Sequence, residues 1–273
     1  MEHFLNHPAV QSGIAPFVAG LIVVAVLQFV RLGGLAAVAG FATAVYLISG
    51  VGFAPLNTAN RIVLLGLAAS VAGLLVDFAF KPTRVGNAVL TLAAGAGAVW
   101  VFMSVLQQKE LMQALLLGGG VAVFLGWLAG IGLLQSGHSV RAGATGLALG
   151  LGGGIACVLG ASAKFGSYAF ALGAASGAFL LWQMVANKRI HAGATFTLTV
   201  ALTAGLALSG AMMLAHLPWY SLAVFALVPP AAMLPLPERS PVFAQAIVAS
   251  AYALAVAAGA CAMVWQSSGA APG

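Results

Sequence analysis

Charged residues are scarce in this sequence. They make up 5% of its 273 residues, and the carboxylates are limited to Glu2, Asp77, Glu110 and Glu238. Soluble domains carry about 25% charged residues, so a protein of this composition cannot expose most of its surface to water. All the carboxylates except Asp77 fall in tails or in short polar stretches. This placement excludes a catalytic pair of carboxylates within the apolar segments.

Several other chemical signals are also missing. The two cysteines, Cys157 and Cys261, lie in apolar segments without metal-ligand spacing, and we expect them to be packing residues. No histidine lies inside an expected helix, which excludes haem ligands on facing helices. The chain has no HExxH, Gly-x-Ser-x-Gly or Gly-Lys-Ser/Thr motif. Its basic residues are dispersed and cannot follow a phosphate backbone. We therefore predict no cofactor, no metal site and no nucleic-acid partner.

Long apolar runs dominate the chain. Hydrophobic residues make up 62% of it, the mean hydropathy is +1.10, and only short polar stretches interrupt the runs. A helix needs about 20 apolar residues to cross a hydrocarbon core of ~30 Å. The pattern predicts an all-α, polytopic bundle of about ten transmembrane helices, with residues 1–273 forming one transmembrane domain and no soluble domain. We predict helices at residues 13–30, 33–53, 62–80, 85–106, 111–134, 142–163, 166–186, 192–215, 219–234 and 242–266.

Local chemistry supports several of these boundaries. Ser240-Pro241 combines an N-cap with proline at the first helical position. Pro218 occupies the equivalent place before the ninth segment. Pro229-Pro230 falls inside that segment and removes two backbone donors, so we expect the helix to kink or break there. The N-terminus lacks the basic region of a signal peptide, and we expect the first helix to be retained.

The distribution of Lys and Arg predicts the orientation. Alternate connections, starting with the first, hold most of these residues: Arg31, Lys81, Arg84, Arg141, Lys188, Arg189 and Arg239. The remaining connections hold Arg61, Lys109 and Lys164. By the positive-inside rule, the first set faces the cytoplasm and both termini lie outside. We expect a cell membrane of the bacterial inner-membrane type.

Small residues recur at helical spacing. Gly126/Gly130, Gly146/Gly150/Gly154 and Gly173/Gly177 each lie on one helix face, which predicts close packing of the fifth, sixth and seventh helices. Such faces could also join other membrane subunits or a second copy of the chain. Basic residues that open successive pairs of helices are about 50 residues apart, which suggests repeated two-helix hairpins. Any array of helices with short loops would show a similar spacing.

Two groups of polar residues are candidates for function. Asp77 is the one carboxylate inside an apolar helix, and it either forms an ion pair with Lys81 at the membrane boundary or handles protons or cations. Thr195, Thr199 and Thr203 share a face of the eighth helix. Their hydroxyls could join helices or, beside the helix broken at Pro229 and Pro230, line a cavity.

The sequence leaves two main functions open. The first is a permease or channel for a small solute or ion, favoured by the broken helix, the threonine face and Asp77. The second is a non-catalytic structural or assembly subunit of a larger membrane complex, favoured by sparse charge and small-residue faces. An enzyme is the weaker third hypothesis, because no nucleophile or acid–base set is visible. The helix number is similar to that of small bacterial permeases, but no motif extends this likeness.

Overall fold

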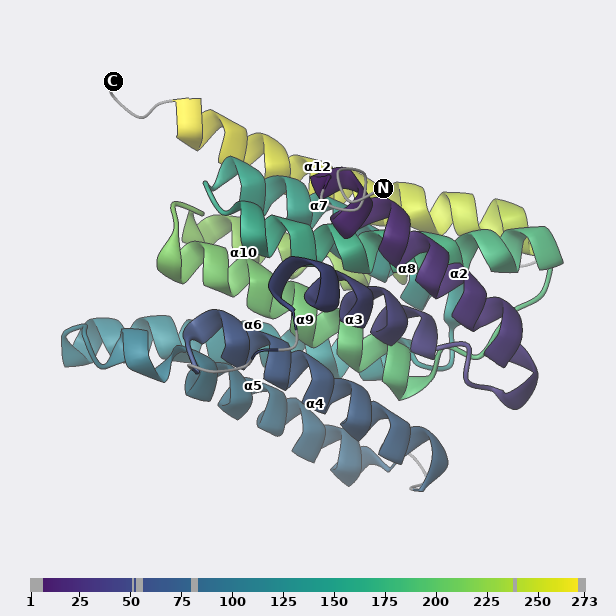
Figure 1. Cartoon of the computed structure of the whole chain (residues 1–273), viewed down its shortest axis with the longest axis horizontal. Helices are drawn as coiled ribbons and strands as arrows, with labels where there is room; N and C mark the ends of the chain where they lie inside the picture. Colours follow the sequence, from purple (N-terminus) through teal and green to yellow (C-terminus); the bar gives the residue numbers. More distant parts are fainter. Residues whose placement is uncertain (1–6, 51, 53–55, 80–82, 238–239, 270–273) are drawn as a thin grey trace.

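The described part of the chain is mostly helical and contains no strand. The computed structural model describes residues 7–50, 52, 56–79, 83–237 and 240–269. The first helix is built from η1 (Val10–Ile14), α2 (Ala15–Leu27) and η2 (Gln28–Val30). The others are α3 (Leu35–Ser49), α4 (Thr58–Phe78), α5 (Arg84–Leu106), α6 (Leu111–Gln135), α7 (Ser139–Leu159), α8 (Ala163–Ala186), α9 (Gly193–Leu214), α10 (Trp219–Phe225), α11 (Val228–Ala232) and α12 (Val242–Gly269). The prediction of an all-α helix bundle is confirmed (Figure 1).

The ten predicted segments each correspond to a pass along the bundle. Eight helices in the described residues are long and apolar enough to cross a membrane. The two shorter segments are α3 and the pair α10–α11. The chain is therefore a multi-pass membrane protein, and its helices require a lipid environment.

The connections gather at two opposite ends of the bundle. At one end, which we call the Arg189 end, the backbone N–H of Gly193 donates to the Ser136 carbonyl oxygen over 3.2 Å. At the other, the Arg61 end, the hydroxyls of Ser49 and Tyr168 lie 2.6 Å apart. The N–H of His216 donates to Gly160 O there over 3.0 Å. Both short segments connect these ends. Which end faces the cytoplasm stays a prediction from the charge distribution.

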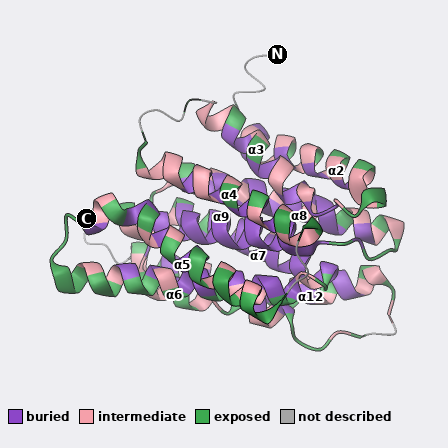
Figure 2. Ribbon diagram, turned by 90° about the horizontal axis from the view of Figure 1, so that it is seen from below, coloured by how far each residue is buried: buried purple, intermediate pink, exposed green. Residues whose placement is uncertain are grey.

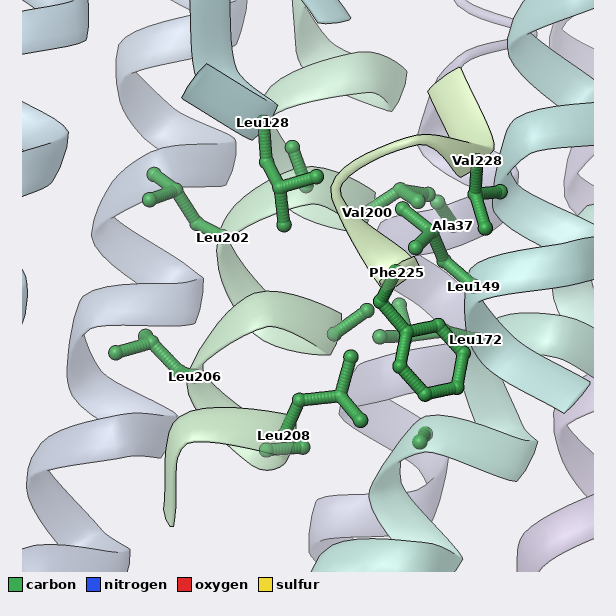
Figure 3. Packing of buried hydrophobic residues seen from close by; sticks show 14 of the residues in the cluster. Ala37, Leu128, Leu149, Leu172, Val200, Leu202, Leu206, Leu208, Phe225 and Val228 are labelled. Carbon is green, nitrogen blue, oxygen red and sulfur yellow. The ribbon is translucent and has the colours of Figure 1, made fainter. Parts of the chain in front are cut away.

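Helix α9 forms the centre of the bundle. Every residue from Gly193 to Ala211 is buried, and α3, α4, α6, α7 and α8 all contact this helix. Figure 3 shows Leu202, Leu206 and Leu208 of α9 among the packed apolar side chains. The outer helices instead expose large apolar side chains such as Leu92 and Val123, at 74% and 73%. Figure 2 shows the buried centre and the exposed rim. This arrangement suits a protein surrounded by lipid.

Helices α7 and α8 pack backbone against backbone. A Cβ added at Gly150 would lie 2.9 Å from the carbonyl oxygen of Ala169 and still closer to the backbone of Gly173. One added at Gly173 would lie 2.8 Å from the Leu151 N–H nitrogen. The close contact predicted from these glycines is confirmed for α7 and α8. It also means that their small-residue faces cover each other inside the chain.

The glycine face of α6 has a different neighbour. Cβ atoms added at Gly126 and Gly130 would be 3.4 Å from atoms of Thr91 in α5, an ordinary van der Waals separation. These two glycines therefore approach α5 less closely than Gly150 approaches α8, whereas a Cβ at Gly95 of α5 would lie 2.9 Å from Ala122 O of α6. Two of the suggested hairpins, α5–α6 and α7–α8, pack along their length, whereas α4 packs mainly on α9.

The predicted break in the ninth segment is present. Helix α10 ends at Phe225, and α11 begins at Val228 with Pro229 and Pro230 in its first turn. Pro230 has no N–H for the Ala226 carbonyl four residues earlier, and the indole Nε1 of Trp127 donates to that oxygen over 2.8 Å. A side chain of α6 thus replaces the bond that proline removes, as membrane depth requires.

Candidate functional site

The Arg189 end contains a polar cavity of about 400 Å³. It lies between the start of α7, the α8–α9 connection, the segment before α12 and the first turn of α12. Its lining combines two arginines, a histidine and uncharged polar groups: Gly137, His138, Ser139, Val140, Arg141, Arg189, Leu236 and Gln245. None of these described lining residues is acidic. The cavity therefore presents a net positive surface.

Hydrogen bonds hold Arg189 in place over this cavity. Its Nη2 donates to Oε1 of Gln245 over 2.9 Å, and Nε2 of Gln245 donates to the Ser240 carbonyl oxygen over 2.8 Å. The side-chain oxygen of Asn187 accepts from the Val242 N–H over 3.2 Å, which joins the same connection to α12. Gln245 is buried, and its amide fixes the guanidinium. The other N–H groups of Arg189 have no acceptor among the described residues.

The start of α7 adds unpaired donors to the cavity. His138 is its N-cap residue, and its side chain accepts no hydrogen bond from the first turn. Within the described residues, the backbone N–H groups of Ser139, Val140 and Arg141 have no acceptor, and neither has the Arg141 guanidinium. Ser139 and Val140 are buried. Buried N–H groups normally find a partner, and the helix dipole makes this end positive.

A layer of glutamine side chains lies directly below the cavity, at the ends of α6 and α8. The hydroxyl of Thr145 donates to Oε1 of Gln135 over 2.9 Å. Nε2 of Gln135 in turn donates over 2.8 Å to the carbonyl oxygen of Pro229 in the broken helix. The Ser139 hydroxyl, at the start of α7, donates to Oε1 of Gln183 over 2.7 Å. Gln183 thus holds Ser139 of the cavity wall, and Gln135 holds α11 against α6 and α7.

Asp77 lies outside the cavity and binds the first turn of α9. Its Oδ1 accepts from the Ala194 N–H over 2.7 Å, and its Oδ2 accepts from the N–H and hydroxyl of Thr195 over 2.9 and 2.6 Å. Gly193 opens this turn with φ +70, and a Cβ there would lie 2.7 Å from Cγ of Asp77. The carboxylate is thus an N-cap supplied by a distant helix. Lys81, the expected ion-pair partner, lies outside the described residues.

The predicted threonine face lies in the contact between α9 and α4. Thr195 packs beside Gly73, and the Thr199 hydroxyl is 2.9 Å from that of Ser70. A Cβ at Gly66 would lie 2.8 Å from Oγ1 of Thr203, a buried hydroxyl without a hydrogen-bond partner. Helix α4 therefore fills the space in front of this face.

The structure brings together residues that the sequence interpretation kept apart. Arg141 and Arg189 were interpreted as orientation signals. Their common signal was a polar side chain at the same end of successive helices. Gln135 binds Pro229 of the broken helix, whereas Asp77 and the threonines form a separate α4–α9 contact. Since Arg189 and Gln245 are separated by 56 positions, only the folded chain shows the cavity.

Comparisons with known proteins give no assignment. No family model matches the chain, and no curated protein matches it. In the described residues, no group of three His, Cys, Asp or Glu side chains could hold a metal ion.

Proposed function

We propose that this membrane protein is a permease for a small solute or ion, with its entrance at the polar cavity of the Arg189 end. The observation that carries the proposal is the broken helix α10–α11 beside that cavity. Gln135 and Trp127 of α6 bind the carbonyl oxygens of Pro229 and Ala226. Discontinuous helices with backbone groups held in this way are common at the substrate sites of transporters.

The hydrogen bonds from α6 allow α11 to move without unfolding. A carbonyl bound by a side chain can exchange that partner for a solute or for water, whereas one inside a continuous helix cannot. Helix α11 contacts α7 and α12, whose first turns line the cavity. In this proposal a displacement of α11 shifts those first turns and thereby changes the width of the cavity.

Flux into liposomes tests this proposal. Purified protein is reconstituted, and uptake of labelled phosphate, glycerol and rubidium ions is compared with uptake by empty liposomes. We expect protein-dependent uptake of at least one probe. Pro229→Ala combined with Pro230→Ala restores two N–H donors and should reduce that uptake. Pro218→Ala, before α10, is the matched control. Uptake equal to that of empty liposomes for all three probes would contradict the proposal.

The subunit hypothesis predicts a different result. A structural or assembly subunit that is extracted from native membranes in mild detergent should purify with a stoichiometric partner protein. After reconstitution it should transport none of the three probes. Purification of the untagged partner with the tagged chain, together with absent flux, would favour that function over a permease.

A further inference from the structure

We infer that the cavity at the Arg189 end is a binding site for an oxyanion, specifically a phosphate group carried by a small organic molecule or a lipid. As a substrate site this inference rests on the permease proposal, but as a binding site it can be tested alone. Arg141, Arg189 and the first turn of α7 are the groups that would contact the phosphate.

Apart from the bond of Arg189 to Gln245, the donors of the site have no acceptor among the described residues. The Arg141 guanidinium and the N–H groups of Ser139, Val140 and Arg141 are unpaired among the described residues. A helix N-terminus with free N–H groups binds phosphate through its donors and its dipole. Here the guanidinium groups of Arg141 and Arg189 add planar donor pairs that match two oxygens of a phosphate. The uncapped helix and the two arginines thus both favour a negatively charged ligand.

The framework of the site is already in place. Gln245 is 4% exposed and fixes the guanidinium of Arg189, while Ser139 is 5% exposed and is held by Gln183. Preformed donors lose little entropy when a ligand binds. The cavity volume of about 400 Å³ lies at the small end of ligand pockets, roughly 300–1,000 Å³. It leaves space for an organic group beside the phosphate.

Direct binding measurements test the site without any flux. The whole chain is purified in a maltoside detergent, which contains no phosphate, and glycerol 3-phosphate binding is measured by equilibrium dialysis. In the second arm, phosphatidylglycerol retained through purification is quantified by mass spectrometry. Arg141→Gln and Arg189→Gln remove site donors, and Arg141→Lys keeps the charge. Arg61→Gln is the matched control, because Arg61 lies at the other end, 5.6 Å from the ring centroid of Trp100.

We expect saturable binding of glycerol 3-phosphate that Arg141→Gln and Arg189→Gln each weaken roughly 10- to 100-fold. Arg141→Lys should weaken it less, and Arg61→Gln should leave it unchanged. If the retained lipid is lost in the same two variants, the site is confirmed with a lipid headgroup as its phosphate source. Melting curves of each variant verify that it is folded.

Three results would overturn the inference. One is the absence of binding for both probes, and another is equal binding by the parent and the Arg141→Gln variant. The third concerns Glu238, which lies outside the described residues. Binding that appears only after Glu238→Gln would show that this carboxylate occupies the arginines in the parent. Anion binding without flux would contradict the permease proposal and support the binding site. Flux of glycerol without anion binding would support the permease proposal and contradict the binding site.

Discussion

The carboxylate of Asp77 and the first turn of α9 meet at Thr195, whose backbone N–H and hydroxyl both donate to Oδ2 over 2.9 and 2.6 Å. The two residues are 118 positions apart, so this bond joins α4 to the central helix. An acidic side chain at the positive end of a helix satisfies donors that would otherwise be unpaired.

Asp77→Asn should therefore destabilise the fold. The amide keeps one acceptor oxygen but loses the charge, so we expect the free energy of unfolding to fall by about 1–3 kcal/mol. Unfolding in mixed micelles measures this change. Asn57→Ala, which removes the exposed cap of α4, is the control and should cost about 1 kcal/mol. Flux at matched amounts of folded protein should persist. Unchanged stability with abolished flux would instead assign Asp77 a role in proton or cation handling.

Gly150→Leu should prevent the close approach of α7 and α8. The new side chain would meet the backbone of Gly173, which cannot rotate away as a side chain can. We expect a loss of about 3 kcal/mol or more, seen as a lower melting temperature and reduced yield. Gly259→Leu is the control, since a Cβ at Gly259 has no atom within 4 Å. Equal melting of the two variants would contradict the packing described for α7 and α8.

Gln135→Leu should weaken the attachment of α11. The substitution leaves the Pro229 carbonyl oxygen and the Thr145 hydroxyl without Gln135, and a buried unpaired group costs about 1–3 kcal/mol. Hydrogen exchange of the backbone N–H groups near α11 should accelerate. Gln113→Leu, an exposed position in the same helix α6, is the matched control. Identical exchange in both variants would show that Gln135 does not hold the broken helix.

The arrangement of the connections predicts a labelling pattern. In a background without Cys157 and Cys261, single cysteines at His138 and Lys188 should react with an impermeant reagent from the same face of the membrane. Cysteines at Lys109 and Lys164 should react from the opposite face. The charge distribution further predicts that the first pair is cytoplasmic. Labelling of Lys188 and Lys164 from one face would contradict the count of ten passes.

The sequence alone was sufficient for the helices themselves. Apolar length and polar interruptions placed each segment within a few residues. The ends of α3 and α7 and the start of α4 each differ by four residues from the predicted ones. Helix α4 begins at Thr58 instead of residue 62, because Asn57 is its N-cap and accepts from the Asn60 N–H over 2.8 Å. The proline pair also located the broken helix, since the loss of backbone donors is a local property.

Contacts between distant segments could not be read in the same way. Nothing near Asp77 in the sequence indicates that its acceptors face Thr195, and Arg141 and Arg189 look like ordinary orientation signals. Helix faces in a lipid-embedded chain are apolar on both the buried and the exposed sides, so the amphipathic pattern that orients soluble helices is weak. The cavity of the Arg189 end depends on these pairings.

The position of α9 near the end of the chain has a consequence for biosynthesis. A ribosome adds about 5–20 residues per second, so Asp77 is made roughly 6 to 24 s before Thr195. During this interval α3, α4 and α6 lack the helix that they contact in the finished bundle. Until α9 is made, the early helices are therefore inserted in the membrane but not assembled into the bundle. The translocon or a quality-control protease can recognise helices in this state. Truncation before Gly193 should leave a chain that inserts and is then degraded.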